Sequence, residues 1–237
     1  MYNITTDKKK LNIANKSLRV LYSKMPATKG CIENINKQNG CNAWCCDVQT
    51  PQVLYVEFLH TWKYMIENFT YDQFVEIVQN ALNKYLFAEK NEACIFFDRS
   101  SRMCKQHDTR PYNCRIYGIT PDEEFRPRYE KLKVIYPNIK YQCSLVQTVD
   151  NKAVTKKNID DWWLELKSIE LYIGVRQDLI NDADGGTYRT LHDHMLLHIL
   201  GEEGMEYLSF YRENGSDHEK SDIIHNLSKK LDAFFKK

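Results

Sequence analysis

Apolar side chains recur at intervals of three or four residues along much of the chain, which is the period of an α-helix. Residues 51–69 begin with Pro51, a favourable first helical residue. They carry large apolar side chains at this spacing, namely Leu54, Phe58, Trp62, Met65 and Phe69. Thr70 and Gln73 then have the spacing of a capping box. We therefore expect a second helix, with the stripe Phe74, Ile77, Val78, Ala81, Leu82, Tyr85 and Leu86.

Three further segments have helical patterns. Residues 158–181 carry an apolar stripe on one helical face, formed by Ile159, Trp162, Trp163, Leu166, Ile169 and Ile173. Residues 221–236 begin at Ser221, a suitable N-cap, and carry Ile223, Ile224, Leu227, Leu231, Phe234 and Phe235. Residues 7–24 have a weaker, basic pattern, for which we also predict a helix.

The middle of the chain lacks this periodicity. Four prolines, Pro111, Pro121, Pro127 and Pro137, lie between Cys94 and Cys143. Because proline disfavours helix at its own position and at the preceding one, we expect little regular structure there. A bound metal would supply part of the free energy that ordering this segment costs. The predicted fold is mainly α, with a helical hairpin and C-terminal helices around an irregular, cysteine-rich, metal-binding core.

The same patterns suggest three regions. Residues 1–30 form a basic N-terminal helix or arm, residues 31–150 a cysteine-cluster metal-binding domain, and residues 151–237 a helical C-terminal region packed on it. The chain has 237 residues, of which 43% are hydrophobic, and it can therefore bury a core. Its formal net charge of +1 provides no global field to attract nucleic acid or an anionic membrane, so neither is expected as a partner.

No segment has the roughly 18 consecutive apolar residues that would span a bilayer. No apolar run of signal-peptide length follows Lys8–Lys10. We therefore expect a cytoplasmic protein. In that compartment, clustered cysteines are more often metal ligands or redox centres than disulfides. The alternative is a truncated piece of a secreted protein, which is disfavoured because disulfide scaffolds are usually much shorter.

The eight cysteines follow no familiar short spacing. They are Cys31, Cys41, Cys45, Cys46, Cys94, Cys104, Cys114 and Cys143. The absence of any Cys-x2-Cys pair disfavours zinc ribbons, thioredoxin-like motifs and bacterial ferredoxin sites. A radical-enzyme motif starting at Cys41 is excluded, because its third cysteine would fall at Val48.

The cysteines fall into two groups separated by the two predicted helices. An antiparallel helical hairpin would bring its outer ends together, and so both groups should meet there. A pocket lined by thiolates suits an iron–sulfur cluster or zinc. The adjacent Cys45 and Cys46 cannot easily direct both sulfur atoms to one ion. We expect them to serve different irons, different sites, or one ligand and one buried thiol.

Three motifs carry a resemblance to a known family. They are Gly40-Cys41-Asn42-Ala43-Trp44-Cys45-Cys46, then Cys94-Ile95-Phe96-Phe97-Asp98, then Cys104-x5-Arg110-Pro111-x2-Cys114-Arg115-Ile116-Tyr117. Over residues 31–145 the chain resembles the CxxCxxCC zinc- or iron-chelating family, also called the YkgJ cysteine-cluster family. The family carries about eight cysteines, and one branch is similar to flagellin lysine-N-methylases, which hold an iron–sulfur cluster. This chain departs at the first motif, where Asn39 and Asn42 replace two expected cysteines.

Two arginines flank Cys114. Positive charge at Arg110 and Arg115 would lower the pKa of thiols and offset the negative charge of a thiolate site, so we predict that both contact the bound group. The alternative, which does not exclude the first, is an ion pair with Asp98 or Asp108.

A second candidate site lies at Asp184-Gly185-Gly186 and the helix that follows it. The glycine turn would expose backbone N–H groups to an anion. His194 and His198 are four residues apart and share a helix face, as metal ligands do. The Glu of a zincin motif is absent beside His194. We favour a helix cap with exposed histidines over a ligand site.

These observations favour an iron–sulfur protein, with a [4Fe–4S] type of cluster, that has a redox or metal-dependent modifying role. The corresponding enzymes would be an iron–sulfur-dependent oxidoreductase or a protein-modifying transferase, and the expected partner a redox protein or protein substrate. The first alternative is a non-catalytic zinc protein whose Zn2+ orders an interaction surface. The second is a metal-free thiol sensor, although eight free thiols would be hard to protect from oxidation.

Overall fold

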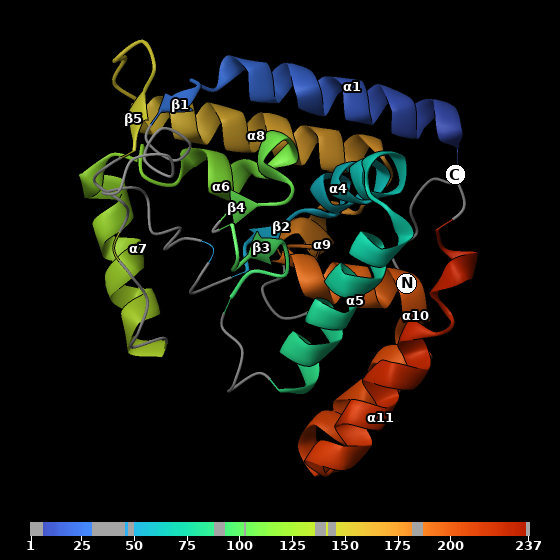
Figure 1. Cartoon of the computed structure of the whole chain (residues 1–237). Coiled ribbons are helices and arrows are strands. Elements are labelled where there is room, and N and C mark those ends of the chain that lie inside the picture. The colour runs from blue at the N-terminus through green and yellow to red at the C-terminus, as the bar shows by residue number, and fades with distance from the viewer. Residues whose placement is uncertain are drawn as a thin grey trace.

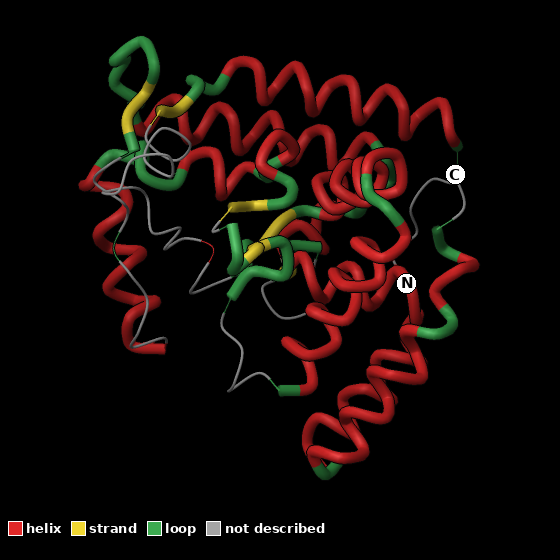
Figure 2. The backbone as a smooth tube through the Cα atoms, in the orientation of Figure 1, coloured by secondary structure: helices red, strands yellow, loops and turns green. Residues whose placement is uncertain are grey.

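A computed structural model of the chain describes residues 7–29, 46, 50–87, 93–101, 103–135, 141, 146–181 and 187–235. Helices make up most of the described chain, and strands occur only as three short antiparallel pairs (Figures 1 and 2). The prediction of a mainly α protein is therefore confirmed.

The helices alternate with loops in which the short strands lie. The α-helices are α1 (Lys8–Lys24), α4 (Tyr55–Asn68), α5 (Tyr71–Leu86), α6 (Tyr112–Ile116), α7 (Asp122–Ile135), α8 (Lys156–Tyr172), α9 (Gln177–Asn181), α10 (Leu191–Asn214) and α11 (Asp217–Ser228). Two 3-10 turns are η1 (His107–Thr109) and η2 (Leu231–Ala233). The paired strands are β1 (Thr28–Lys29) with β5 (Gln147–Thr148), β2 (Gln52–Val53) with β6 (Arg189–Thr190), and β3 (Phe97–Asp98) with β4 (Met103–Cys104).

Two hydrophobic clusters form the core. The larger one lies where α5 packs against α10 and α11, and it includes Phe58, Phe74, Ile77, Phe96 and Met195. The smaller one lies where α1 runs along α8, at the top of Figure 1, and it includes Leu18, Leu21, Leu166 and Ile173. The main helical partner of α5 is thus α10, and not α4 as a simple hairpin would require.

The first two predicted helices are present with one change. Thr70 and Gln73 form the expected capping box: Gln73 N donates to Thr70 Oγ1 at 3.3 Å, and Thr70 N donates to Gln73 Oε1 at 3.0 Å. The prediction that Pro51 starts the preceding helix is wrong. Residues Gln52–Val53 instead pair with β6, and α4 begins at Tyr55. A pairing with residues far along the chain therefore overrides the local helical preference.

Two further boundaries differ from the prediction. The helix expected over 158–181 is divided into α8 and α9 by Gly174, whose φ of 96° no helix accommodates. The helix expected to start at Ser221 starts earlier, at Asp217, because Ser216 and Glu219 form a capping box there. The predicted basic helix at residues 7–24 is confirmed as α1, with Asp7 as its N-cap.

The middle segment is more regular than predicted. It holds α6 and the 14-residue α7, which includes Pro127. A proline inside a helix removes one backbone hydrogen bond. In α7, the ring of Phe125 lies 6.2 Å from that of Tyr129 on the far side of Pro127, and Arg126 pairs with Asp122 at 2.6 Å. The aromatic contact spans the proline, and the ion pair supports the turn before it.

α10 is the longest helix and changes direction at Gly201, where φ is 71°. Its first half packs in the larger core, and its second half continues toward α11 at the lower end of the molecule (Figure 1). None of the described helices is both long and apolar enough to cross a membrane.

Candidate metal centre

The hairpin formed by β3 and β4 places Cys104. Phe97 pairs with Cys104 across the two strands, and Lys105 N donates to Phe96 O at 2.9 Å. The turn of the hairpin is fixed by Asp98, whose carboxylate accepts hydrogen bonds from the hydroxyls of Ser100 and Ser101 at 2.6 and 2.9 Å. These bonds hold the pKa of Asp98 well below its usual range. The hairpin therefore orders Cys104 by local bonds.

Cys46 of the first cysteine group contacts Cys94 of the second, although α4 and α5 do not form the simple hairpin that we expected to bring the groups together. Cys94 N donates a hydrogen bond to Cys46 O at 2.6 Å, which joins the segment before α4 to the segment after α5. Cys94 is 7% exposed and belongs to the larger core, and Cys46 and Cys104 pack against the same core. Three of the candidate ligands thus gather on one side of that core.

The thiols of Cys46 and Cys104 are in hydrogen-bonding contact. The hydrogen bond from Cys46 lowers the pKa of Cys104, and the Gln106 backbone N–H and the charge of Arg110 act in the same direction, whereas burial opposes them. A thiol with a lowered pKa is closer to the thiolate form that binds metals. The surroundings of Cys104 therefore shift its thiol toward the ionised form beside Cys46.

The two predicted arginines have different surroundings. Arg115 stacks on the ring of Tyr22, with its guanidinium carbon 4.1 Å from the ring centroid. Its Nε donates to Arg110 O at 2.6 Å, and its Nη2 donates to Asp108 O at 2.9 Å. Arg110 Nε donates to His107 O at 3.1 Å. Arg115 thus uses the main-chain carbonyl of Asp108, and the expected ion pair with its carboxylate is absent from the described residues.

A buried carboxylate connects this loop to the helices. Glu57 is 2% exposed and lies in the first turn of α4. Its Oε1 accepts from Tyr22 Oη and from Tyr112 N, both at 2.6 Å, and its Oε2 accepts from Leu54 N at 3.1 Å. Burial raises the pKa of Glu57, while these hydrogen bonds favour the ionised form.

Glu57 also fixes the start of α6, the short helix that carries Cys114. Tyr112 is the first residue of α6, and the side chain of Cys114 lies within electrostatic range of Arg115 and Tyr22. The apolar pattern of the sequence did not point to Glu57. The available signal was an acidic residue inside an apolar helical stripe, which is unusual for a side chain that faces a core.

Several predicted ligands lie outside the described residues. They are Cys31, Cys41, Cys45 and Cys143, together with the turn at Gly185-Gly186. Among the residues that the structure does describe, no three His, Cys, Asp or Glu side chains are arranged to hold a metal ion. The described part of the centre is therefore the contact between Cys46, Cys94 and Cys104, with Cys114 on the adjoining α6.

The histidine pair of α10 serves packing. His194 is fully buried, and its Nε2 lies 3.1 Å from Val53 O and 2.9 Å from Thr187 O. Burial lowers its pKa to about 4. His198 Nδ1 lies 3.2 Å from Tyr55 Oη, and its ring is 4.6 Å from that of Trp62. The expected helix cap is present at Thr190, and His198 is exposed as predicted, whereas His194 is buried, contrary to the prediction.

Comparison with known proteins identifies one domain. A family model named CxxCxxCC, described as a putative zinc- or iron-chelating domain, matches residues 36–151. The matched segment contains every cysteine except Cys31. The resemblance drawn from the cysteine motifs is thereby confirmed for this segment. No curated protein and no solved structure matches the chain.

Proposed function

We propose that the zinc- or iron-chelating domain at residues 36–151 holds an iron–sulfur cluster of the [4Fe–4S] type, and that the cluster serves a redox or metal-dependent modifying role. The supporting observation is the contact of Cys46 with Cys94 and Cys104. Cys46 and Cys94 are 48 residues apart in the sequence, but the fold brings them together. The chain provides eight cysteines, whereas a structural zinc ion needs only four ligands.

The chemistry of the donor set fits such a cluster. Thiolates are the protein ligands of [4Fe–4S] clusters. The lowered pKa of Cys104 favours its thiolate, and the partly buried position of the thiols limits access of water. The cluster itself would supply one-electron transfer or a Lewis-acidic iron. The residues of this chain would hold the cluster and set the charge around it.

Arg110 and Arg115 are the residues that would adjust this charge. Arg110 acts electrostatically on Cys104, and Arg115 acts on Cys114. Positive charge beside a thiolate-bound cluster offsets its negative charge and stabilises the reduced form. Because main-chain carbonyls and the Tyr22 ring hold Arg115 in place, its charge stays in position next to Cys114 in α6.

Metal analysis tests the proposal. The protein would be purified without oxygen and assayed for iron, acid-labile sulfide and zinc, with a visible spectrum of the same sample. We expect a brown protein with about four irons and four sulfides per chain. A colourless protein with stoichiometric zinc would contradict it and would favour one or two structural zinc sites.

A pair of variants in β4 locates the ligands. Cys104→Ser should lower the metal content severalfold, because serine is a poor ligand for iron in place of a thiolate. Met103→Ser is the matched control: Met103 precedes Cys104 in the same strand and is 37% exposed. If both variants retain the metal and spectrum of the wild type, Cys104 is not a ligand.

A further inference from the structure

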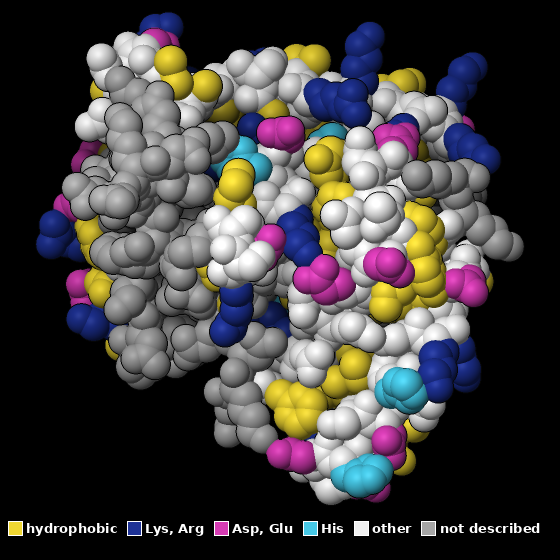
Figure 3. All heavy atoms as spheres, in the orientation of Figure 1, with side chains coloured by type: hydrophobic (Ala, Val, Ile, Leu, Met, Phe, Trp, Pro, Cys, Tyr) yellow, Lys and Arg dark blue, Asp and Glu magenta, His cyan; other side chains and the backbone are white. Residues whose placement is uncertain are grey.

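The charge of the chain is divided unevenly along its length. α1 carries six Lys or Arg residues and no acidic residue between Lys8 and Lys24, which leaves 27 basic against 32 acidic residues elsewhere. The near-neutral total therefore conceals one strongly basic helix. In Figure 3, Lys and Arg side chains project from the upper edge, where α1 lies in Figure 1.

The outward face of α1 combines charge with apolar surface. Lys9, Lys16 and Arg19 are exposed and lie on the side away from the buried residues of the helix. Ile13 and Val20 lie beside them and are 49% and 48% exposed. Singly exposed apolar side chains are common on protein surfaces, and here they add apolar area to a charged face.

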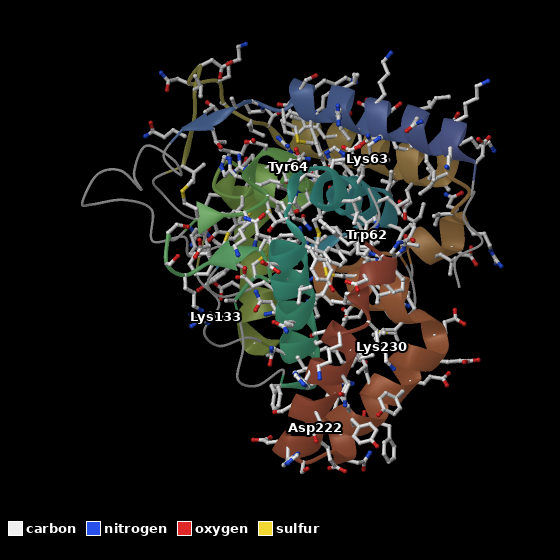
Figure 4. All side chains as sticks on the ribbon, turned by 45° about the vertical axis from the view of Figure 1, so that its right-hand side comes forward. Trp62, Lys63, Tyr64, Lys133, Asp222 and Lys230 are labelled. Atoms are coloured by element: carbon white, nitrogen blue, oxygen red, sulfur yellow. The ribbon has the colours of Figure 1, made fainter. Side chains whose placement is uncertain are left out.

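Positive charge continues from this face onto α4. Burial is the main cause that lowers the pKa of His60 to about 4, and the positive charges of Arg19, Arg115 and Lys63 act in the same direction. Lys63 lies beside α1 at the upper end of Figure 4, whereas Asp222 of α11 lies at the opposite end.

The second half of α10 has the opposite chemistry. Glu203, Glu206 and Glu213 are exposed on one face, together with Tyr207 and Phe210, which are 50% and 60% exposed. Both aromatic rings pack on the neighbouring Tyr211, at centroid distances of 4.8 and 5.4 Å. The buried Leu208 occupies the other side of the helix. This half of the helix thus presents a second apolar face to solvent.

The spacings of the two sets of charges are the same. The acidic residues follow one another at intervals of three and seven, and the basic residues at seven and three. An antiparallel pairing of the two helices therefore places Arg19 opposite Glu203, Lys16 opposite Glu206 and Lys9 opposite Glu213. Each set spans ten residue steps, or about 15 Å of helix. The apolar residues between the charges then lie in the contact.

We propose that two copies of this chain associate through this contact, with α1 of one copy packed antiparallel on residues 203–213 of the other. Among the described residues, no acidic side chain pairs with Lys9, Lys16 or Arg19, and no basic one pairs with Glu203 or Glu206. Glu213 has only its neighbour Arg212, at 3.7 Å. The two faces lie at opposite ends of one molecule and cannot meet within it (Figure 1).

The contact is small and highly charged, which sets its expected strength. One helix pair buries less than the roughly 1,600 Å² of a standard interface, so association should be weak and reversible. Its affinity should fall as salt rises, because surface charges are screened. The contact does not involve the cysteine loops and is independent of the proposed metal function.

Sedimentation equilibrium of the full-length, metal-loaded protein tests the proposal. At low salt the weight-average mass should rise above 28.1 kDa with increasing protein concentration, and high salt should reduce this rise. A mass that stays at the monomer value over the whole concentration range at low salt would overturn the proposal.

Charge-reversal variants identify the surfaces. K16E/R19E and E203K/E206K should each weaken self-association at least about tenfold, because like charges then face one another. An equimolar mixture of the two variants should associate again, since each supplies a face complementary to the other. Failure of the mixture to associate would exclude this pairing even if the wild-type protein self-associates.

K8E/K10E is the matched control. It makes the same change in net charge within α1, at exposed positions outside the three proposed pairs. We expect wild-type self-association from this variant. A loss equal to that of K16E/R19E would show that only the total charge of α1 matters, and it would overturn the specific contact.

Discussion

The helical layers and the cysteine loops of this protein differ in how their backbone is ordered. The helices are held by fully buried apolar side chains such as Phe58, Phe74 and Leu166. Residues 93–101 and 103–109 also bury apolar side chains, such as Ile95 and Phe96, but their backbone is held by a two-residue strand pair, by the bonds of Asp98 and by the contact of Cys94 with Cys46. The loops therefore share apolar burial with the helices but have far fewer regular backbone hydrogen bonds.

The two regions are joined at the first turn of α4. Glu57 accepts hydrogen bonds from α1, through Tyr22, and from the cysteine-bearing α6, through Tyr112. From the opposite side, Glu170 of α8 accepts from Tyr55 N at 3.0 Å and Val56 N at 2.7 Å. Two buried carboxylates, Glu57 and Glu170, therefore connect the start of α4 to α1, α6 and α8.

The largest expected effect comes from the helical core. Phe74→Ala should lower the free energy of unfolding of the metal-free protein by about 3–5 kcal/mol, because the ring is fully buried and contacts Trp62 and Phe235. Denaturant unfolding followed by circular dichroism measures this loss. The metal content per folded molecule should stay at the wild-type level.

The conservative variant Phe74→Leu serves as a second test in case Phe74→Ala fails to fold. It should lose less stability than Phe74→Ala and remain folded, because most of the apolar volume is kept. A fall in metal content of folded Phe74→Leu would break the comparison, since it would show that the core and the cysteine loops are not stabilised separately.

Much of the helical layer was predictable from sequence. The stripe of α5 and the Thr70 cap follow local rules, and the structure confirms both. The errors have non-local or backbone causes. The pairing of Gln52–Val53 with β6 depends on residues far along the chain, and the division between α8 and α9 depends on the positive φ of Gly174.

The candidate site was predictable in its chemistry but less so in its geometry. Cysteine spacing identified the two groups, and the contact of Cys46 with Cys94 agrees with their expected approach, but α5 packs on α10 and not on α4 as the expected hairpin requires. It did not identify Glu57 or Tyr22, since a buried hydrogen bond between α1 and α4 leaves no periodic signal. The predicted metal roles of the cysteines stay predictions.

The second effect is a pH dependence at Glu170. Burial raises the pKa of this carboxyl to about 7. Between its unfolded value near 4.5 and pH 7, the folded protein keeps a proton that the unfolded chain has lost, so the free energy of unfolding falls as pH rises. Glu170→Gln removes this contribution. Relative to wild type, the variant should gain about 3 kcal/mol between pH 4.5 and pH 7.5.

The difference between the two proteins is the quantity to measure, because buried histidines have the opposite pH dependence. Urea unfolding at several pH values provides it. Glu165→Gln is the control: Glu165 lies on the same helix and forms an exposed ion pair with Lys24 at 2.6 Å. Parallel curves for Glu170→Gln and wild type would show that Glu170 is ionised throughout, stabilised by the N–H groups of α4.

The smallest effect tests the junction itself. Tyr22→Phe removes the hydrogen bond to Glu57 and should cost about 1–2 kcal/mol of stability in the metal-free protein. Because Glu57 also binds Tyr112 N, we expect hydrogen exchange of that amide to rise more than exchange in α5, which is buried in the other core. Tyr64→Phe is the control, since the half-buried Tyr64 hydroxyl bonds to no described residue. Equal increases in α5 and α6 would mean that Tyr22 stabilises the whole fold. An increase confined to α6 would show that α1, which lies outside the matched segment, positions the helix that carries Cys114.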